Sequence, residues 1–154
     1  MKTETIYKHR IRTVSILTKE PTKGYNAVSS SKVAADIAQG IFNTLDCNQE
    51  HFVILCLDSA NKVQAFKVIH SGGMAFCQVD PRIVFTAALL LGAAGIIVVH
   101  NHPSGYCSPS SDDFAVIAQL KKASELLGIV LLDSLIVGGD AYYSFADNSQ
   151  MGGF

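Results

Sequence analysis

Residues 96–102 read I-I-V-V-H-N-H, an apolar run that ends in two histidines. Small residues at 92–95 precede the run, and a loop rich in proline, glycine and serine follows it. An apolar segment between turn signals, without polar alternation, is typical of a strand that is buried on both faces. We therefore expect residues 96–100 to form an inner strand of a sheet, with His100 at its end.

Helices are predicted on both sides of this strand. Residues 111–127 place apolar side chains at helical spacing and are followed by Gly128, a favoured residue just beyond a helix C-terminus. Asp80 and Pro81 begin another helix that reaches about residue 91, because aspartate caps helices and proline suits the first turn. Serines at 29–31 supply N-cap candidates for a third helix that runs to about residue 45.

The remaining apolar runs predict further strands. Residues 51–58 and 62–70 are partly β-branched and are separated by a short turn, which indicates an antiparallel hairpin. Other strands are expected at 13–17, at 76–79, at 129–137 with a break near Asp133, and at 142–145. This order of strands and helices predicts an α/β fold in which helices flank a mixed sheet.

Length and charge narrow the domain organisation and the classes of function. The 154 residues are 49% hydrophobic, enough for one core, and 12 basic against 13 acidic residues leave a net charge of −1. We expect one domain at 29–146, a preceding segment with one short strand (1–28) and a disordered tail (147–154). The charge does not support nonspecific binding to DNA, which stays open only as a local contact.

The sequence also indicates a soluble, cytoplasmic protein. It has no membrane-spanning run of about eighteen apolar residues and no secretory leader pattern. Its four cysteines form no C-x-x-C pair, which favours reduced thiols over disulfides or a thiolate zinc site.

Two histidines and one aspartate predict a metal site. His100 and His102 flank the point where the strand runs out into a loop, and Pro103 allows the chain to bend there. Asp113 follows in the first turn of the next helix, which can return its carboxylate to the same point. Two imidazoles, one carboxylate and an open fourth position are the arrangement of catalytic zinc, which activates water for hydrolysis.

Two more residues are candidates for catalysis. Glu50, just before the first hairpin strand, is the best-placed carboxylate for a general base, and Ser110 can donate a hydrogen bond to an oxyanion. Each also has a simpler interpretation, because Glu50 suits a solvated strand end and Ser110-x-x-Asp113 resembles a capping box. Cys107 with a nearby histidine suggests a nucleophile, but no third residue orients such a pair.

The pattern His100-x-His102-x7-Ser110-x-x-Asp113 resembles the JAMM (MPN+) motif. The longer run His-Asn-His-Pro-Ser-Gly is similar to that of the RadC-like JAB domain, and the likeness extends over about 29–145. Further similar segments are Glu50-His51-Phe52, Leu57-Asp58, Asp80-Pro81-Arg82, Leu127-Gly128-Ile129 and Leu132-Asp133.

This resemblance implies a cytidine-deaminase-like α/β core with one zinc ion on His100, His102 and Asp113, Glu50 as the base and Ser110 at the oxyanion. Compared with full-length RadC proteins, we expect this chain to lack the helix-hairpin-helix region that precedes the domain. It also departs from the family pattern at three places, namely Ser134 for histidine, Gly73 for threonine, and Tyr106-Cys107 for acidic and proline residues.

Three classes of function follow from these observations. The first is a zinc metallopeptidase that cleaves a peptide or isopeptide bond of an unidentified protein or peptide. The second is a non-catalytic JAB-like module that binds protein or DNA in DNA repair or on a mobile element, although an intact ligand set argues against it. A metal-dependent nuclease is the weakest, because a single-metal site with few carboxylates does not suit a two-ion mechanism.

Overall fold

The structure is a computed structural model that describes residues 27–72 and 79–151. The strand expected at 13–17, most of the one at 76–79 and the end of the tail lie outside the described residues. Val79 itself is described and is buried, but it belongs to no strand.

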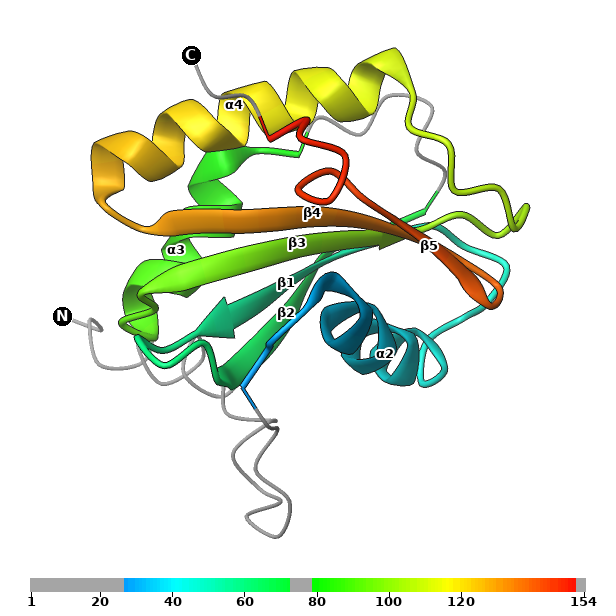
Figure 1. The fold of residues 1–154 in the computed structure, drawn as a ribbon, viewed down its shortest axis with the longest axis horizontal. Coiled ribbons are helices and arrows are strands. Elements are labelled where there is room, and N and C mark those ends of the chain that lie inside the picture. The colour runs from blue at the N-terminus through cyan, green and yellow to red at the C-terminus, as the bar shows by residue number, and fades with distance from the viewer. Residues whose placement is uncertain (1–26, 73–78, 152–154) are drawn as a thin grey trace, which may run out of the picture.

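Five strands form one mixed sheet in the order β2-β1-β3-β4-β5 (Figure 1). Only β3 and β4 are parallel neighbours, and the other pairs are antiparallel. The central position of β3, predicted from its apolar run, is confirmed. The strands are β1 (His51–Leu57), β2 (Val63–Ser71), β3 (Gly95–Asn101), β4 (Val130–Gly138) and β5 (Ala141–Ser144).

Within the described residues, three helices cover the two faces of the sheet, so the predicted α/β class is confirmed (Figure 1). Alternate residues of β1 face opposite layers: Phe52 packs with the core under α3 (Pro81–Leu90) and α4 (Ser111–Leu127), whereas Val53 packs with the core under α2 (Ser31–Phe42). Asp80 caps α3 and left-handed Gly128 ends α4, as predicted, while α2 is capped by Ser30 and ends three residues earlier than expected.

The expected break near Asp133 is wrong, because β4 is continuous. The strand contains a bulge instead: Ile96 pairs with Leu131 and Ile97 with Asp133, so Leu132 is the extra residue. The Asp133 carboxylate is buried and accepts hydrogen bonds from the Ser134 and Ala146 backbone and from the Ser144 hydroxyl. These hydrogen bonds stabilise the buried carboxylate within the strand. The sequence had suggested that Asp133 would interrupt the strand.

The expected disordered tail is also wrong for residues 147–151. Gln150 N–H donates to the Phe145 carbonyl at 2.7 Å, and the Ser31 hydroxyl binds the Asp147 carboxylate. Met151 packs against the core near α4. Contacts with residues far away in the chain therefore order a segment whose own composition is polar.

Candidate metal centre

Strand β3 delivers both histidines to one point. His100 is 2% exposed and pairs with Phe52 of β1, whose ring stacks on the imidazole at a centroid distance of 6.2 Å. His102 lies just beyond the strand, and its backbone N–H donates to Val137 O of β4 at 2.8 Å. The backbone of both ligand candidates is thus held by neighbouring strands.

The third candidate, Asp113, comes from the first turn of α4. Ser110 caps this helix: its hydroxyl accepts from Asp113 N–H at 3.2 Å and donates to Asp113 Oδ2 at 2.8 Å, and Ser110 N–H also donates to Oδ2 at 2.7 Å. One carboxylate oxygen is therefore occupied by the cap. The other oxygen, Oδ1, lies 3.2 Å from His100 Nε2.

The three predicted ligands converge. His100 Nε2 lies 3.2 Å from His102 Nε2, and one ligand atom from each of the three residues lies within 4.8 Å of the other two. Tetrahedral zinc with bonds of about 2.0–2.1 Å places neighbouring ligand atoms roughly 3.3 Å apart. The observed distances of 3.2 Å therefore fit a zinc ion at this point. No other group of three such residues occurs in the described part of the chain.

A hydrogen bond leaves one ring nitrogen of His102 available to bind a metal. Its Nδ1 lies 2.6 Å from Tyr106 O, and because a carbonyl only accepts, Nδ1 carries the proton. Nε2 then presents a lone pair toward the other two ligand atoms, as in most metal-bound histidines. His100 differs, since its buried Nδ1 has no hydrogen-bond partner among the residues that the structure describes.

Asp113 is held in its charged form. Burial raises the pKa of this carboxyl, but the hydrogen bond and charge of His100 and the two hydrogen bonds from Ser110 outweigh burial and hold the pKa at about 2. The helix N-terminus also favours a negative charge at this position. Asp113 therefore offers an anionic oxygen at neutral pH.

Glu50 precedes β1 by one residue, and it is not one of the three converging ligands. It lies two residues before Phe52, and in an extended chain residues two apart face the same side of a sheet. Since Phe52 stacks on His100, this is the side of the sheet on which the candidate ligand His100 lies. The Glu50 Oε2 atom is buried and has no hydrogen-bond partner in the described ranges.

Ser110 acts as the helix cap in this structure, which was the simpler of its two interpretations. Its hydroxyl proton points to Asp113 Oδ2, so it is not directed at a substrate. The oxyanion role of Ser110 stays a prediction.

Cys107 packs as a structural residue. Its Sγ contacts the carbonyl oxygens of Gly105 at 4.0 Å and Gly138 at 3.9 Å. Burial raises the pKa of the Cys107 thiol, although the Gly138 contact lowers it in part. No contact with a histidine is seen within the described residues, so the geometry does not favour a Cys-His nucleophile.

Of the other departures from the family pattern, Ser134 is buried in β4, and Gly73 lies outside the described residues.

Three residues that support the geometry of the site were not predicted from the sequence. The Tyr106 carbonyl leaves no sequence signal because every residue has one. Gly138 allows a close approach, since a Cβ there would lie 2.7 Å from Gly105 O. The third residue, Asn101, lies between the two histidines. This position was the only feature of the sequence that could have pointed to it.

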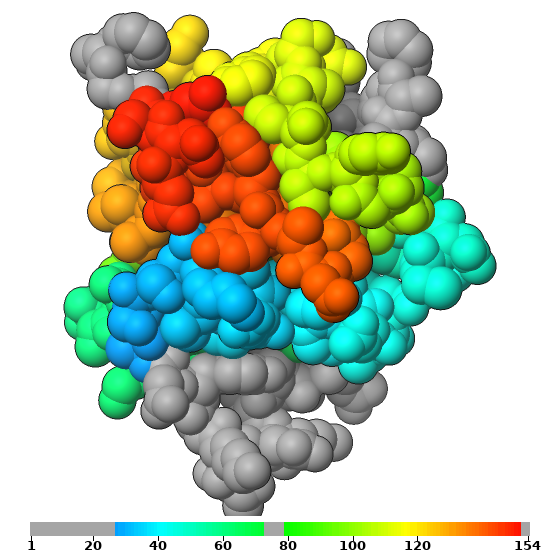
Figure 2. All heavy atoms as spheres, turned by 45° about the vertical axis from the view of Figure 1, so that its right-hand side comes forward, coloured from blue at the N-terminus to red at the C-terminus, as the bar shows by residue number. Residues whose placement is uncertain are grey.

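A cavity of about 480 Å³ adjoins His102. Figure 2 shows the loop after β3, the β4–β5 turn and the segment after α2 side by side on this face. The cavity is lined by Gln39, Phe42, Asn43, Leu45, Cys47, Asn101, His102, Pro103, Val137 and Gly139.

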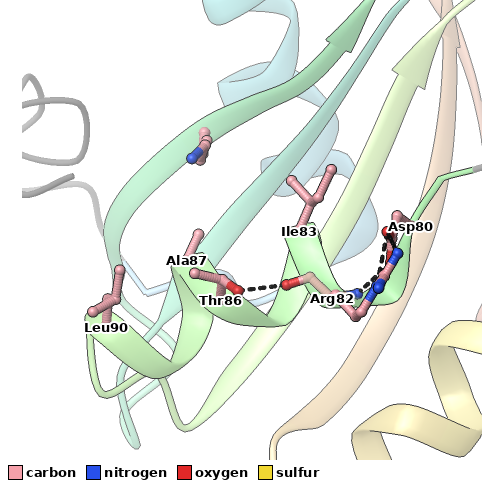
Figure 3. A pocket seen from close by; sticks show the side chains of 7 residues that line it. Asp80, Arg82, Ile83, Thr86, Ala87 and Leu90 are labelled. Carbon is pink, nitrogen blue, oxygen red and sulfur yellow. Dashed lines mark hydrogen bonds and ion pairs between the residues drawn. The ribbon is translucent and has the colours of Figure 1, made fainter. Parts of the chain in front are cut away.

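Another hollow, of about 410 Å³, lies along α3 and includes Lys67 of β2 (Figure 3). Arg82 binds Asp80 there at 2.7 Å, and this hydrogen bond lowers the pKa of Asp80. The hollow shares no lining residue with the metal ligands, so it is a separate surface feature.

Comparison with known proteins identifies the fold family. The family model of the RadC-like JAB domain matches residues 28–151. The chain belongs to this family. UPF0758 proteins are similar to it: that of Streptococcus gordonii is 39% identical over 86% of this chain and 57% of its own length. That of Flavobacterium johnsoniae is 42% identical over 78% of this chain and 52% of its own length.

This RadC-like JAB chain spans about half the length of the curated relatives that it matches. The names of these relatives state no activity. Among the described residues, no helix combines the length and apolar composition needed to cross a bilayer.

Proposed function

We propose that this RadC-like JAB domain is a zinc-dependent hydrolase that cleaves a peptide or isopeptide bond. The observation that carries the proposal is the convergence of His100 Nε2, His102 Nε2 and Asp113 Oδ1. Three protein ligands for one zinc ion per chain leave a fourth position open, as in catalytic rather than structural zinc sites.

The zinc ion and Glu50 have different roles in the proposed hydrolysis. Zinc held there would lower the pKa of a water molecule and polarise the substrate carbonyl. Glu50 accepts the proton of the attacking water and returns it to the leaving nitrogen. The buried Oε2 of Glu50 has no hydrogen-bond partner among the described residues, which supports this role because such an acceptor is free to take a proton.

Ser110 serves the site in two ways under this proposal. As the cap of α4 it orients Asp113, and its hydroxyl rotates toward the substrate to stabilise the oxyanion. Asp113 Oδ2 then keeps the hydrogen bond from Ser110 N–H, so the carboxylate stays in position.

The cavity beside His102 supports a polypeptide as the substrate. Gln39 and Asn43 bind each other there through Gln39 Nε2 and Asn43 Oδ1, and the remaining atoms of these two amide groups can pair with a peptide backbone. A phosphodiester is less suitable, because within the described part of the chain the metal-binding group contains only one carboxylate.

Metal analysis combined with one substitution tests the proposal. Protein purified without added zinc is expected to bind one zinc ion per chain, directly or after reconstitution. Glu50→Gln should keep the metal and lose hydrolysis of a quenched fluorescent peptide library, while Glu125→Gln, on the exposed face of α4, should keep both.

Two results would contradict the proposal. Failure to bind zinc or another transition metal under any condition overturns the metal centre. Zinc binding with no hydrolysis by the unaltered protein, and with cellular function retained in Glu50→Gln, would instead support the non-catalytic module.

A further inference from the structure

Asn101 joins the metal-binding strand to the backbone on both sides of Glu50. Its Nδ2 donates to Gln49 O at 2.9 Å, and its Oδ1 accepts from His51 N–H at 2.7 Å. The residue lies between His100 and His102 at the end of β3. One side chain therefore connects the segment that carries two metal ligands to the residues before and after the candidate base.

Ordinary strand pairing does not supply this connection. The pairing of β1 with β3 begins at Phe52 and His100, so it stops two residues short of Glu50. On the other side, Gly72 N–H donates to Glu50 O at 2.9 Å, and the His51 ring is held by Ser71 and by Asp46 O. Asn101 thus continues the contact between the two segments beyond the last paired residues.

The chemistry of this contact requires an amide side chain. One end of the group must donate to a carbonyl and the other must accept from an N–H, and the side chain of asparagine does both. Aspartate would keep the acceptor for His51 but would place a negative oxygen against Gln49 O. Alanine would lose both hydrogen bonds.

We infer that Asn101 is a positioning residue that holds Glu50 at a set distance and orientation relative to the metal ligands. The inference rests on the proposed function, because it assigns Asn101 a role through Glu50 as the base. A displacement of about 1 Å at a catalytic group can lower the rate roughly 100-fold, so such a support has a measurable consequence.

Cobalt(II) alone is the probe for the test, since no substrate is needed. The visible spectrum of bound cobalt reports its coordination geometry, and Glu50 should influence that geometry through the solvent ligand. The full chain is loaded with cobalt as the unaltered protein and as Asn101→Ala, Asn101→Asp, Glu50→Ala and Asn148→Ala. Asn148 is the matched control, because its amide donates to Ser144 O outside the site.

Amide hydrogen exchange at His51 is the second measurement. Loss of its hydrogen bond in Asn101→Ala should raise the exchange rate about tenfold, equivalent to about 1.4 kcal/mol. Asn101→Asp should keep the amide protected, and Glu50→Ala and Asn148→Ala should leave the rate unchanged.

The expected result is one cobalt ion per chain in all five proteins. The spectra of Asn101→Ala and Asn101→Asp should shift toward that of Glu50→Ala, and Asn148→Ala should match the unaltered protein. The inference is overturned if Glu50→Ala changes the spectrum and Asn101→Ala does not, or if His51 exchange is the same in Asn101→Ala. A spectrum that Glu50→Ala leaves unchanged would overturn the base assignment of the proposed function, and the positioning role with it.

Discussion

The imidazole of His102 donates a hydrogen bond from Nδ1 to the main-chain oxygen of Tyr106, 2.6 Å away. This bond makes the shape of the loop after β3 part of the candidate metal centre, because it determines which ring nitrogen would be free to bind a metal ion. The loop in turn packs closely against Gly138 of β4. The contact between the loop and Gly138 therefore affects the position of the His102 ring.

Gly138→Ala should weaken zinc binding. Its Cβ would lie 2.7 Å from Gly105 O and 3.0 Å from Cys107 Sγ, so the loop must move and the Tyr106 carbonyl with it. Changes in such outer partners cost about 10-fold to 100-fold in metal affinity. Competition with a chelating dye measures the affinity, with Gly40→Ala as the control because a Cβ there meets nothing within 4 Å. Equal affinities of both variants would show that the loop adapts.

Ser110→Ala should separate the two roles of this residue. Loss of a helix cap costs about 1 kcal/mol of unfolding free energy. Ser30→Ala removes the cap of α2, whose hydroxyl accepts from Val33 N–H, and should cost a similar amount without affecting the site. The oxyanion role predicts that kcat falls roughly 100-fold to 1,000-fold in Ser110→Ala alone. A kcat that both variants leave unchanged would limit Ser110 to capping.

Asp133→Asn should reduce the dependence of stability on pH. Burial raises the pKa of the Asp133 carboxyl, against the lowering effect of its hydrogen bonds from Ser144, Ala146 and Ser134. The folded protein therefore binds more protons than the unfolded chain between the ordinary pKa of 3.8 and the raised value, and stability falls as pH rises through this window. Urea unfolding of the metal-free proteins from about pH 3.5 to about pH 7 should show this fall in the unaltered protein and not in Asp133→Asn. If the unfolding free energies of the two proteins changed with pH in the same way, the pH dependence would not come from Asp133.

Cys107→Ser should keep full zinc content and full activity. The thiol contacts backbone carbonyls and burial raises its pKa, so we expect it to have no nucleophilic role. In the folded protein, alkylation by iodoacetamide should modify exposed Cys47 first and spare Cys56, because burial raises the Cys56 pKa to about 12. Loss of hydrolysis in Cys107→Ser with zinc retained would revive the nucleophile interpretation.

Local patterns predicted most of the elements that the structure describes and pointed to the three candidate ligands. The apolar run before His100 placed the central strand, and Asp80-Pro81 and Gly128 marked a helix start and a helix end. His100, His102 and Asp113 could be predicted because short spacings on a strand end and a helix start already restrict where their side chains can meet. Each of these signals depends on residues that are close together along the chain.

The tertiary structure alone decided how the site is supported. Asn101 meets residues 49 and 51 only because β1 and β3 pair in one register, and Tyr106 contributes a carbonyl that every residue possesses. The bulge at Leu132 and the order of residues 147–151 likewise depend on contacts with distant segments. Spacing and side-chain type thus indicate the candidate ligands. Backbone hydrogen bonds across the sheet determine the geometry around them, and they exist only once the chain has folded.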